Sequence, residues 1–176
     1  MERLLTLYSE VQSTDVRWLW YPFIAIGKIT LLQGDPGDGK SSMMMNLIAE
    51  LSTGGKTPDG CKIGAPQKVI YQCSEDGVSD TIKPRLERCG ADCGKIAFIN
   101  EEVYNGLTLD DERIRQAIIE FRHPQKKRPF ILMETLSEMQ NDCKTIRKLE
   151  EKIGKEKHIV MSYNTDWNNK NLPSRA

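Results

Sequence analysis

Glycines, a lysine and a serine are spaced between residues 34 and 41 in a way that suits the binding of phosphate groups. The segment reads Gly34-Asp35-Pro36-Gly37-Asp38-Gly39-Lys40-Ser41 and fits the P-loop pattern G-x-x-x-x-G-K-[ST]. Its glycines let the backbone curl tightly and aim several N–H groups at phosphate oxygens. Lys40 would reach the β- and γ-phosphates, and the Ser41 hydroxyl would complete the coordination of Mg²⁺. The pattern predicts a site for a nucleoside triphosphate.

The residues on either side predict the elements that such a loop needs. Residues 28–33 are typical of a short buried strand, and residues 42–51 have the apolar spacing of a helix. A strand, this loop and a helix N-terminus are the arrangement that binds a triphosphate. We expect ATP with Mg²⁺ to bind nine consecutive residues: Gly34, Asp35, Pro36, Gly37, Asp38, Gly39, Lys40, Ser41 and Ser42.

An acidic residue that could activate water follows the second predicted strand. This strand spans residues 68–74, and Glu75 comes directly after it. If the strand lies next to the P-loop strand, Glu75 would face the γ-phosphate and polarise an attacking water. The alternative is that Glu75 belongs to a solvated acidic turn.

These two motifs and their separation resemble those of RecA-like P-loop ATPases. They resemble in particular the RepA-type branch, which includes hexameric replicative helicases and phage- or plasmid-encoded ATPases. It covers about residues 15–122 and rests on Trp18-Leu19, Pro22, residues 27–37 and residues 71–86. The resemblance implies that Glu75 is the catalytic glutamate and that Lys40 neutralises charge on the phosphates. It also implies ATP hydrolysis in DNA replication or recombination, single-stranded DNA as a partner, and a homo-oligomeric ring in which a neighbour supplies an arginine finger.

The second half of the chain departs from that family at two positions. Glu134 follows a strand predicted at residues 128–133, where the family has an aspartate that holds Mg²⁺ through water. Glutamate is longer by one methylene, so Glu134 either holds the metal from a slightly receded strand end or is an ordinary strand terminus. Asn164 follows the strand at residues 158–163, where RepA-like proteins have a polar sensor, often His, for the γ-phosphate. Asn164 can donate a hydrogen bond but cannot carry charge, and a plain loop asparagine is the alternative.

Strands and helices alternate along the chain. Besides the elements named above, we expect a strand at 95–100 and helices at 79–89, from Thr108 onwards and at 142–156. The alternation predicts a three-layer α/β fold around a mostly parallel sheet, a RecA-like core that is shortened at its C-terminus.

The chain divides into three parts by composition. Residues 1–27 are an N-terminal lead-in whose aromatic residues either form a lid beside the nucleotide base or cover one edge of the core. Residues 28–166 are the ATPase core, and residues 167–176 are a polar tail.

Composition limits the partners. The 25 basic and 25 acidic residues balance, so net charge gives no case for nucleic acid, although the basic run at 122–128 is either a contact to a phosphate backbone or a solvated loop. There is no apolar run long enough to cross a bilayer and no signal peptide, so we expect a cytoplasmic protein without a membrane partner. The five cysteines favour reduced thiols, and no Cys or His pairing has zinc-ligand spacing.

Three functions remain open at this point. The first is an ATPase of DNA replication or recombination. The second is a nucleotide-binding module with negligible hydrolysis, in which the nucleotide stabilises the fold by mass action. The third is a small-molecule kinase, which shares the P-loop but would need an acceptor site.

Overall fold

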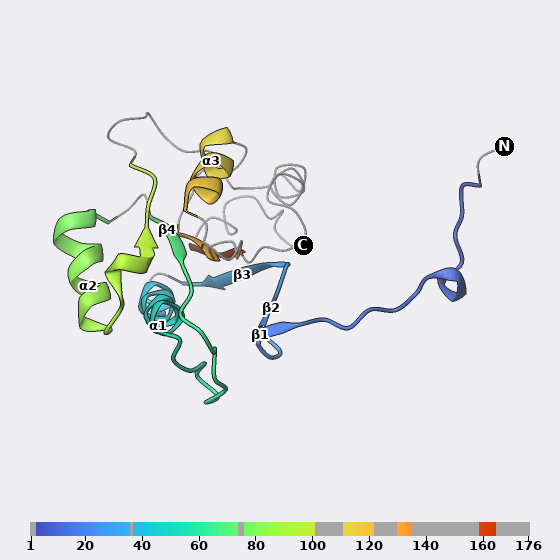
Figure 1. Cartoon of the computed structure of the whole chain (residues 1–176), viewed down its shortest axis with the longest axis horizontal. Coiled ribbons are helices and arrows are strands. Elements are labelled where there is room, and N and C mark those ends of the chain that lie inside the picture. Colours follow the sequence, from blue (N-terminus) through green and yellow to red (C-terminus); the bar gives the residue numbers. More distant parts are fainter. Residues whose placement is uncertain are drawn as a thin grey trace, which may run out of the picture.

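A five-stranded parallel sheet forms the centre of the molecule (Figure 1). The computed structural model describes residues 3–35, 37–73, 76–100, 111–121, 130–134 and 159–164. The sheet has the strand order β3-β7-β6-β4-β5. Its strands are β3 (Ile29–Gly34), β4 (Val69–Cys73), β5 (Ile96–Ala97), β6 (Phe130–Glu134) and β7 (Ile159–Asn164). All four pairings within it are parallel.

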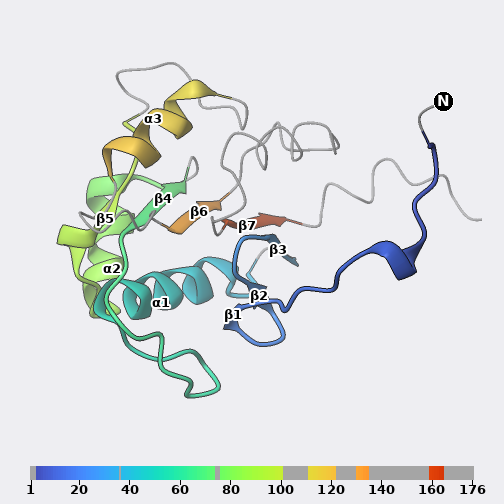
Figure 2. The ribbon, with the colours of Figure 1, turned by 45° about the vertical axis from the view of Figure 1, so that its right-hand side comes forward.

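Helices cover both faces of this sheet (Figure 2). The helices α1 (Lys40–Thr53) and α2 (Lys83–Arg88) lie on one face, and α3 (Glu112–Glu120) lies on the other. Right-handed crossovers explain the division, because the chain moves one way across the sheet from β3 to β4 and β5, and moves back from β5 to β6. The predicted three-layer α/β fold of a RecA-like P-loop core is confirmed.

β4, the strand that precedes Glu75 in the chain, is not the neighbour of the P-loop strand β3 in the sheet. β7 and β6 lie between β3 and β4, so the adjacency that we assumed for the strand before Glu75 is wrong. Neighbouring strands are about 4.8 Å apart, which places β4 about 14 Å from β3. The assumption failed because the crossover connections decide the order of parallel strands. The hydrophobic pattern of a single strand does not reveal which strands lie beside it.

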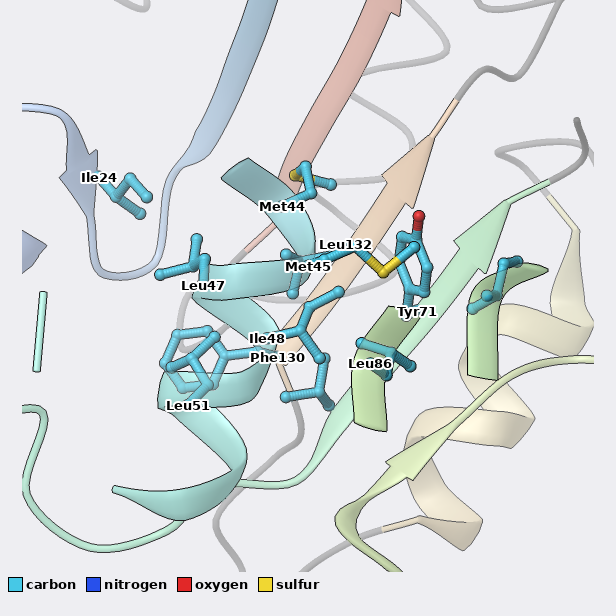
Figure 3. Packing of buried hydrophobic residues seen from close by; sticks show 12 residues of the cluster. Ile24, Met44, Met45, Leu47, Ile48, Leu51, Tyr71, Leu86, Phe130 and Leu132 are labelled. Atoms are coloured by element: carbon cyan, nitrogen blue, oxygen red, sulfur yellow. The ribbon is translucent and has the colours of Figure 1, made fainter. Parts of the chain in front are cut away.

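The apolar side of α1 packs against the sheet and forms the main core (Figure 3). Met44, Ile48 and Leu51 are completely buried on this helix, where they meet residues of the central strands such as Tyr71 and Leu132. Burial of a side chain of this size stabilises the fold by about 1.5–3 kcal/mol. The core therefore fixes α1, and with it the loop that precedes the helix.

One predicted helix differs from the expectation in its type of turn, and another begins later than expected. The helix expected at 79–89 is a π-helical turn, η2 (Val78–Ile82), that continues into α2. α3 is capped by Asp111, whose carboxylate accepts a hydrogen bond from the N–H of Arg113, and not by Thr108, which lies outside the described residues. Asp111 is therefore the N-cap of this helix, three residues later than the start expected at Thr108.

The edge strand β5 is shorter than the expected strand at 95–100. Only Ile96 and Ala97 pair with β4, and the chain beyond them is held by a side chain. The amide of Gln72, which is 3% exposed, accepts a hydrogen bond from the N–H of Ile99 at 2.9 Å and donates one to its C=O at 3.2 Å. A side-chain amide has the same donor and acceptor pattern as a peptide group. The Gln72 side chain therefore takes the place of a backbone partner for Ile99.

An N-terminal arm and a small hairpin precede the sheet. The arm contains one 3₁₀ turn, η1 (Tyr8–Glu10), and extends away from the sheet in both views (Figures 1 and 2). The hairpin of β1 (Trp18–Trp20) and β2 (Ile24–Ala25) places Ile24 in the core. A second 3₁₀ turn, η3 (Cys93–Lys95), leads into β5. None of the described helices is long and apolar enough to span a membrane.

We expect the substitution Gln72→Ala to lower the free energy of unfolding by about 1–3 kcal/mol, because it leaves the Ile99 backbone groups without these partners. Urea denaturation followed by circular dichroism measures the change. Gln116→Ala on the exposed side of α3 is the matched control and should change stability by no more than about 0.5 kcal/mol. Equal, small effects of the two substitutions would contradict the role given to the Gln72 amide.

Candidate functional site

The loop between β3 and α1 has the backbone conformation that a phosphate site requires. Gly37 and Gly39 have φ angles of +89° and +83°, values that a residue with a Cβ adopts only with strain. Gly39 is also the N-cap of α1, and no side chain caps this helix there. The positive end of the α1 dipole therefore points toward the position that an anion would occupy in front of the loop.

Lys40 folds back over the same loop. Its Nζ donates hydrogen bonds to the C=O of Gly34 at 2.9 Å and to the C=O of Asp35 at 2.7 Å. The ammonium group is thus held at the mouth of the loop, between the end of β3 and the start of α1. An anion in front of the loop would meet this positive charge together with the helix N-terminus.

Asp38 makes a contact that sequence reasoning missed. Its Oδ2 accepts a hydrogen bond from the N–H of Asp35 at 2.7 Å. The spacing of the motif does not reveal this contact, since residue 38 is a variable position of the pattern. The only signal in the sequence is an acidic residue in a loop that is expected to bind anions.

The parallel sheet brings the loop and two of the predicted site residues to one edge. In the β3–β7 register Gly34 lies opposite Asn164, and in the β6 pairings Glu134 lies opposite Ser162 and Cys73. The backbone of Glu134 is therefore two strands from β3, about 10 Å away, and level with Leu32. Ser41 and Ser42 lie in the first turn of α1.

Glu75 and Pro36 lie outside the described residues. The nearest described residue before Glu75 is Cys73, the last residue of β4, and the nearest after it is Asp76. Arg85 of α2 donates to a carboxylate oxygen of Asp76 at 3.0 Å. This exposed ion pair adds little stability, but it links the segment after β4 to α2.

A separate pocket of about 750 Å³ lies beyond the ends of β4 and β5. Its lining comes from these strands, η2, α2, η3 and the chain that follows β5, and includes Tyr71, Asp80, Lys83 and Phe98. No residue of 34–42 lines it. Within the described part of the chain, no cluster of His, Cys, Asp and Glu could hold a metal ion by itself.

Comparison with known proteins adds a family and one relative. The sequence model of a family described as an AAA domain matches residues 3–152, most of the chain. A DNA repair protein RadA of Halalkalibacterium halodurans is 32% identical over 95 residues. This match covers 54% of the present chain and 17% of the RadA sequence, so the chain corresponds to a small part of that protein.

We expect the substitution Gly39→Ala to lower the free energy of unfolding by about 1–2 kcal/mol, because Ala pays the cost of a left-handed backbone at φ +83°. Gly60→Ala is the matched control, since Gly60 has φ +84°, equally open surroundings and a place in a distant turn. Urea unfolding without nucleotide should give similar losses for both variants. A normal stability for Gly39→Ala alone would show that the loop relaxes out of the observed conformation.

Proposed function

We propose that this chain, which belongs to the AAA domain family and has a RecA-like P-loop core, binds ATP with Mg²⁺ and hydrolyses it. The observation that carries the proposal is the geometry of the loop at 34–41. The loop contains two glycines with positive φ and precedes a helix N-terminus that no side chain caps at Gly39. The Lys40 ammonium lies at the mouth of the same loop. Each of these features favours an anion with several oxygens, which is the chemistry of a phosphate chain.

Three residues would have separate roles in hydrolysis. Lys40 would exchange its contacts with the Gly34 and Asp35 carbonyls for phosphate oxygens and neutralise the charge that develops on them. Glu75 would orient the water that attacks the γ-phosphorus, so that the bond to the bridging oxygen of ADP breaks and inorganic phosphate leaves. Asn164, opposite Gly34 across the β3–β7 pairing, would donate a hydrogen bond to the γ-phosphate.

Two residues would hold the metal. The Ser41 hydroxyl lies in the first turn of α1, and Glu134 ends β6 at the same edge of the sheet. Oxygen ligands of this kind suit Mg²⁺, which keeps several of its waters. When bound, Mg²⁺ would act as a Lewis acid that reduces the negative charge on the phosphates.

We further propose a role in DNA replication or recombination of the RepA helicase type, with single-stranded DNA as a partner and a homo-oligomeric ring as the working form. The similarity to a protein named for DNA repair supports the first part. The N-terminal arm supports self-association, because it exposes large apolar side chains such as Leu4 (95%) and Tyr8 (96%). A second copy of the chain would cover them and would supply the arginine finger.

A nucleotide-binding module without hydrolysis is the second candidate. Glu134 and Asn164 stand where the RepA-type resemblance implies an aspartate and often a histidine, which favours a weakened catalytic apparatus. A small-molecule kinase is less well supported, because the pocket beyond β4 and β5 does not share residues with the loop at 34–42.

Steady-state ATP hydrolysis with Mg²⁺, measured with and without single-stranded DNA, tests the proposal. We expect DNA to stimulate turnover in the wild type. Lys40→Ala should lose nucleotide binding, because it removes the positive charge at the loop. Glu75→Gln should still bind ATP but turn it over about 10²–10⁴-fold more slowly. Tight binding without turnover in the wild type would instead select the nucleotide-binding module.

The role of the arm can be tested separately by sedimentation velocity with ATP and Mg²⁺. We expect the triple substitution Leu4→Ser, Leu5→Ser and Tyr8→Ser to shift the wild-type oligomer to monomer, since these exposed side chains lose their apolar area. Ile119→Ser on the exposed side of α3 is the control and should leave the oligomer intact. An unchanged oligomer in the triple variant would exclude the arm from the interface.

A further inference from the structure

The hairpin that precedes β3 is anchored to the core of the molecule. Its strands β1 and β2 pair antiparallel, and the N–H of Phe23 donates to the C=O of Trp20 at 2.8 Å across the turn. Ile24 is 2% exposed and belongs to the same buried cluster as Leu47 of α1 (Figure 3), and Leu19 packs against that cluster. Core packing therefore fixes the position of the hairpin.

The same hairpin exposes several aromatic rings. Tyr21 is 68% exposed, Phe23 is 61% exposed and Trp18 is 38% exposed. The rings of Trp18 and Tyr21 meet edge to face with their centroids 5.2 Å apart, and the Phe23 ring lies 4.9 Å from that of Trp20. These ring contacts favour a defined arrangement of the side chains. Exposed apolar groups that are gathered in this way mark a site of interaction.

The charge of the hairpin segment is positive. Residues 16–28 contain Arg17 and Lys28 but neither aspartate nor glutamate, although the 25 basic and 25 acidic residues of the whole chain balance. Both side chains are exposed, and none of the ion pairs of the described residues includes either of them. The N–H of Ile26 donates to the C=O of Arg17 at 2.8 Å and so keeps the two ends of the segment together. A partner with negative charge fits this surface best.

Single-stranded DNA combines negative charge with flat apolar groups. Its bases expose faces that stack on aromatic side chains, and its phosphates attract arginine and lysine. In a duplex, by contrast, the neighbouring bases cover those faces. A protein partner would satisfy the apolar rings but gives no reason for the segment to lack acidic residues.

We propose that this hairpin is a binding surface for single-stranded DNA, on which unpaired bases stack and phosphates contact the flanking basic residues. The stacking residues are Trp18, Tyr21 and Phe23, and the basic residues are Arg17 and Lys28. The inference rests on the proposed function, since it gives the DNA partner proposed there a place on this chain.

Fluorescence anisotropy of labelled oligo(dT), titrated with the full chain at several salt concentrations, tests the inference. We expect Tyr21→Ala to weaken the Kd about tenfold, as for the loss of one base stack. Tyr21→Phe keeps the ring and should stay within about twofold of the wild type. Because Tyr21→Ala removes no charge, its salt dependence should match that of the wild type. Lys28→Gln should instead lower the slope of log Kd against log salt by about 0.7.

Two controls separate base stacking from general effects. Phe98→Ala removes a ring that is 48% exposed at the opposite edge of the sheet, beyond β5, and should leave the Kd within about twofold of the wild type. An oligonucleotide of abasic sites keeps the phosphates but lacks the bases. The wild type should bind it more weakly than oligo(dT), and Tyr21→Ala should cause no further loss. Circular dichroism checks that each variant is folded.

The outcomes distinguish the inference from the function on which it rests. If the wild type binds oligo(dT) and Tyr21→Ala binds it equally well, the hairpin is not the stacking surface and the inference is overturned, while the DNA partner stands. If the folded wild type binds no oligo(dT) even at low salt, the proposed DNA partner fails and the inference fails with it. ATP hydrolysis measured without DNA is unaffected by either result.

Discussion

The turn from β3 into α1 is held at both of its ends, and the geometry of the whole site follows from that constraint. β3 pairs with β7 along its full length, from Ile29 to Gly34. α1 is fixed by the burial of Met44, Ile48 and Leu51 against the sheet. The loop between them is therefore positioned by strand pairing and core packing. Such pre-organisation lowers the cost of ordering the loop when an anion binds.

The strand order decides which residues can act together at the edge of the sheet. Because β7 and β6 lie between β3 and β4, Asn164 is next to Gly34, and Glu134 is between Ser162 and Cys73. A catalytic role for Glu75, two residues after Cys73, would thus be exerted beside Glu134.

The sequence predicted those parts of the molecule that depend on neighbouring residues. The loop at 34–41 and the α1 helix follow from local spacing and apolar periodicity. The strand order could not be predicted, because it depends on how crossovers pack across the sheet. The same limit applies to contacts made by single side chains. Nothing in the pattern indicated that Gln72 would hold Ile99 or that Asp111 would cap α3.

The proposed site contains more acidic than basic residues. Asp35 and Asp38 lie in the loop, Glu134 ends a strand at the same edge, and Lys40 is the basic residue of the loop. A triphosphate would add about four negative charges to this set, more than one ammonium group can balance. Under the proposed function, hydrolysis would need positive charge in addition to Lys40, which Mg²⁺ and a basic residue of a neighbouring copy would supply. Under the proposed function, this shortage couples catalysis to assembly, because a single chain could bind nucleotide but would stabilise the transition state poorly.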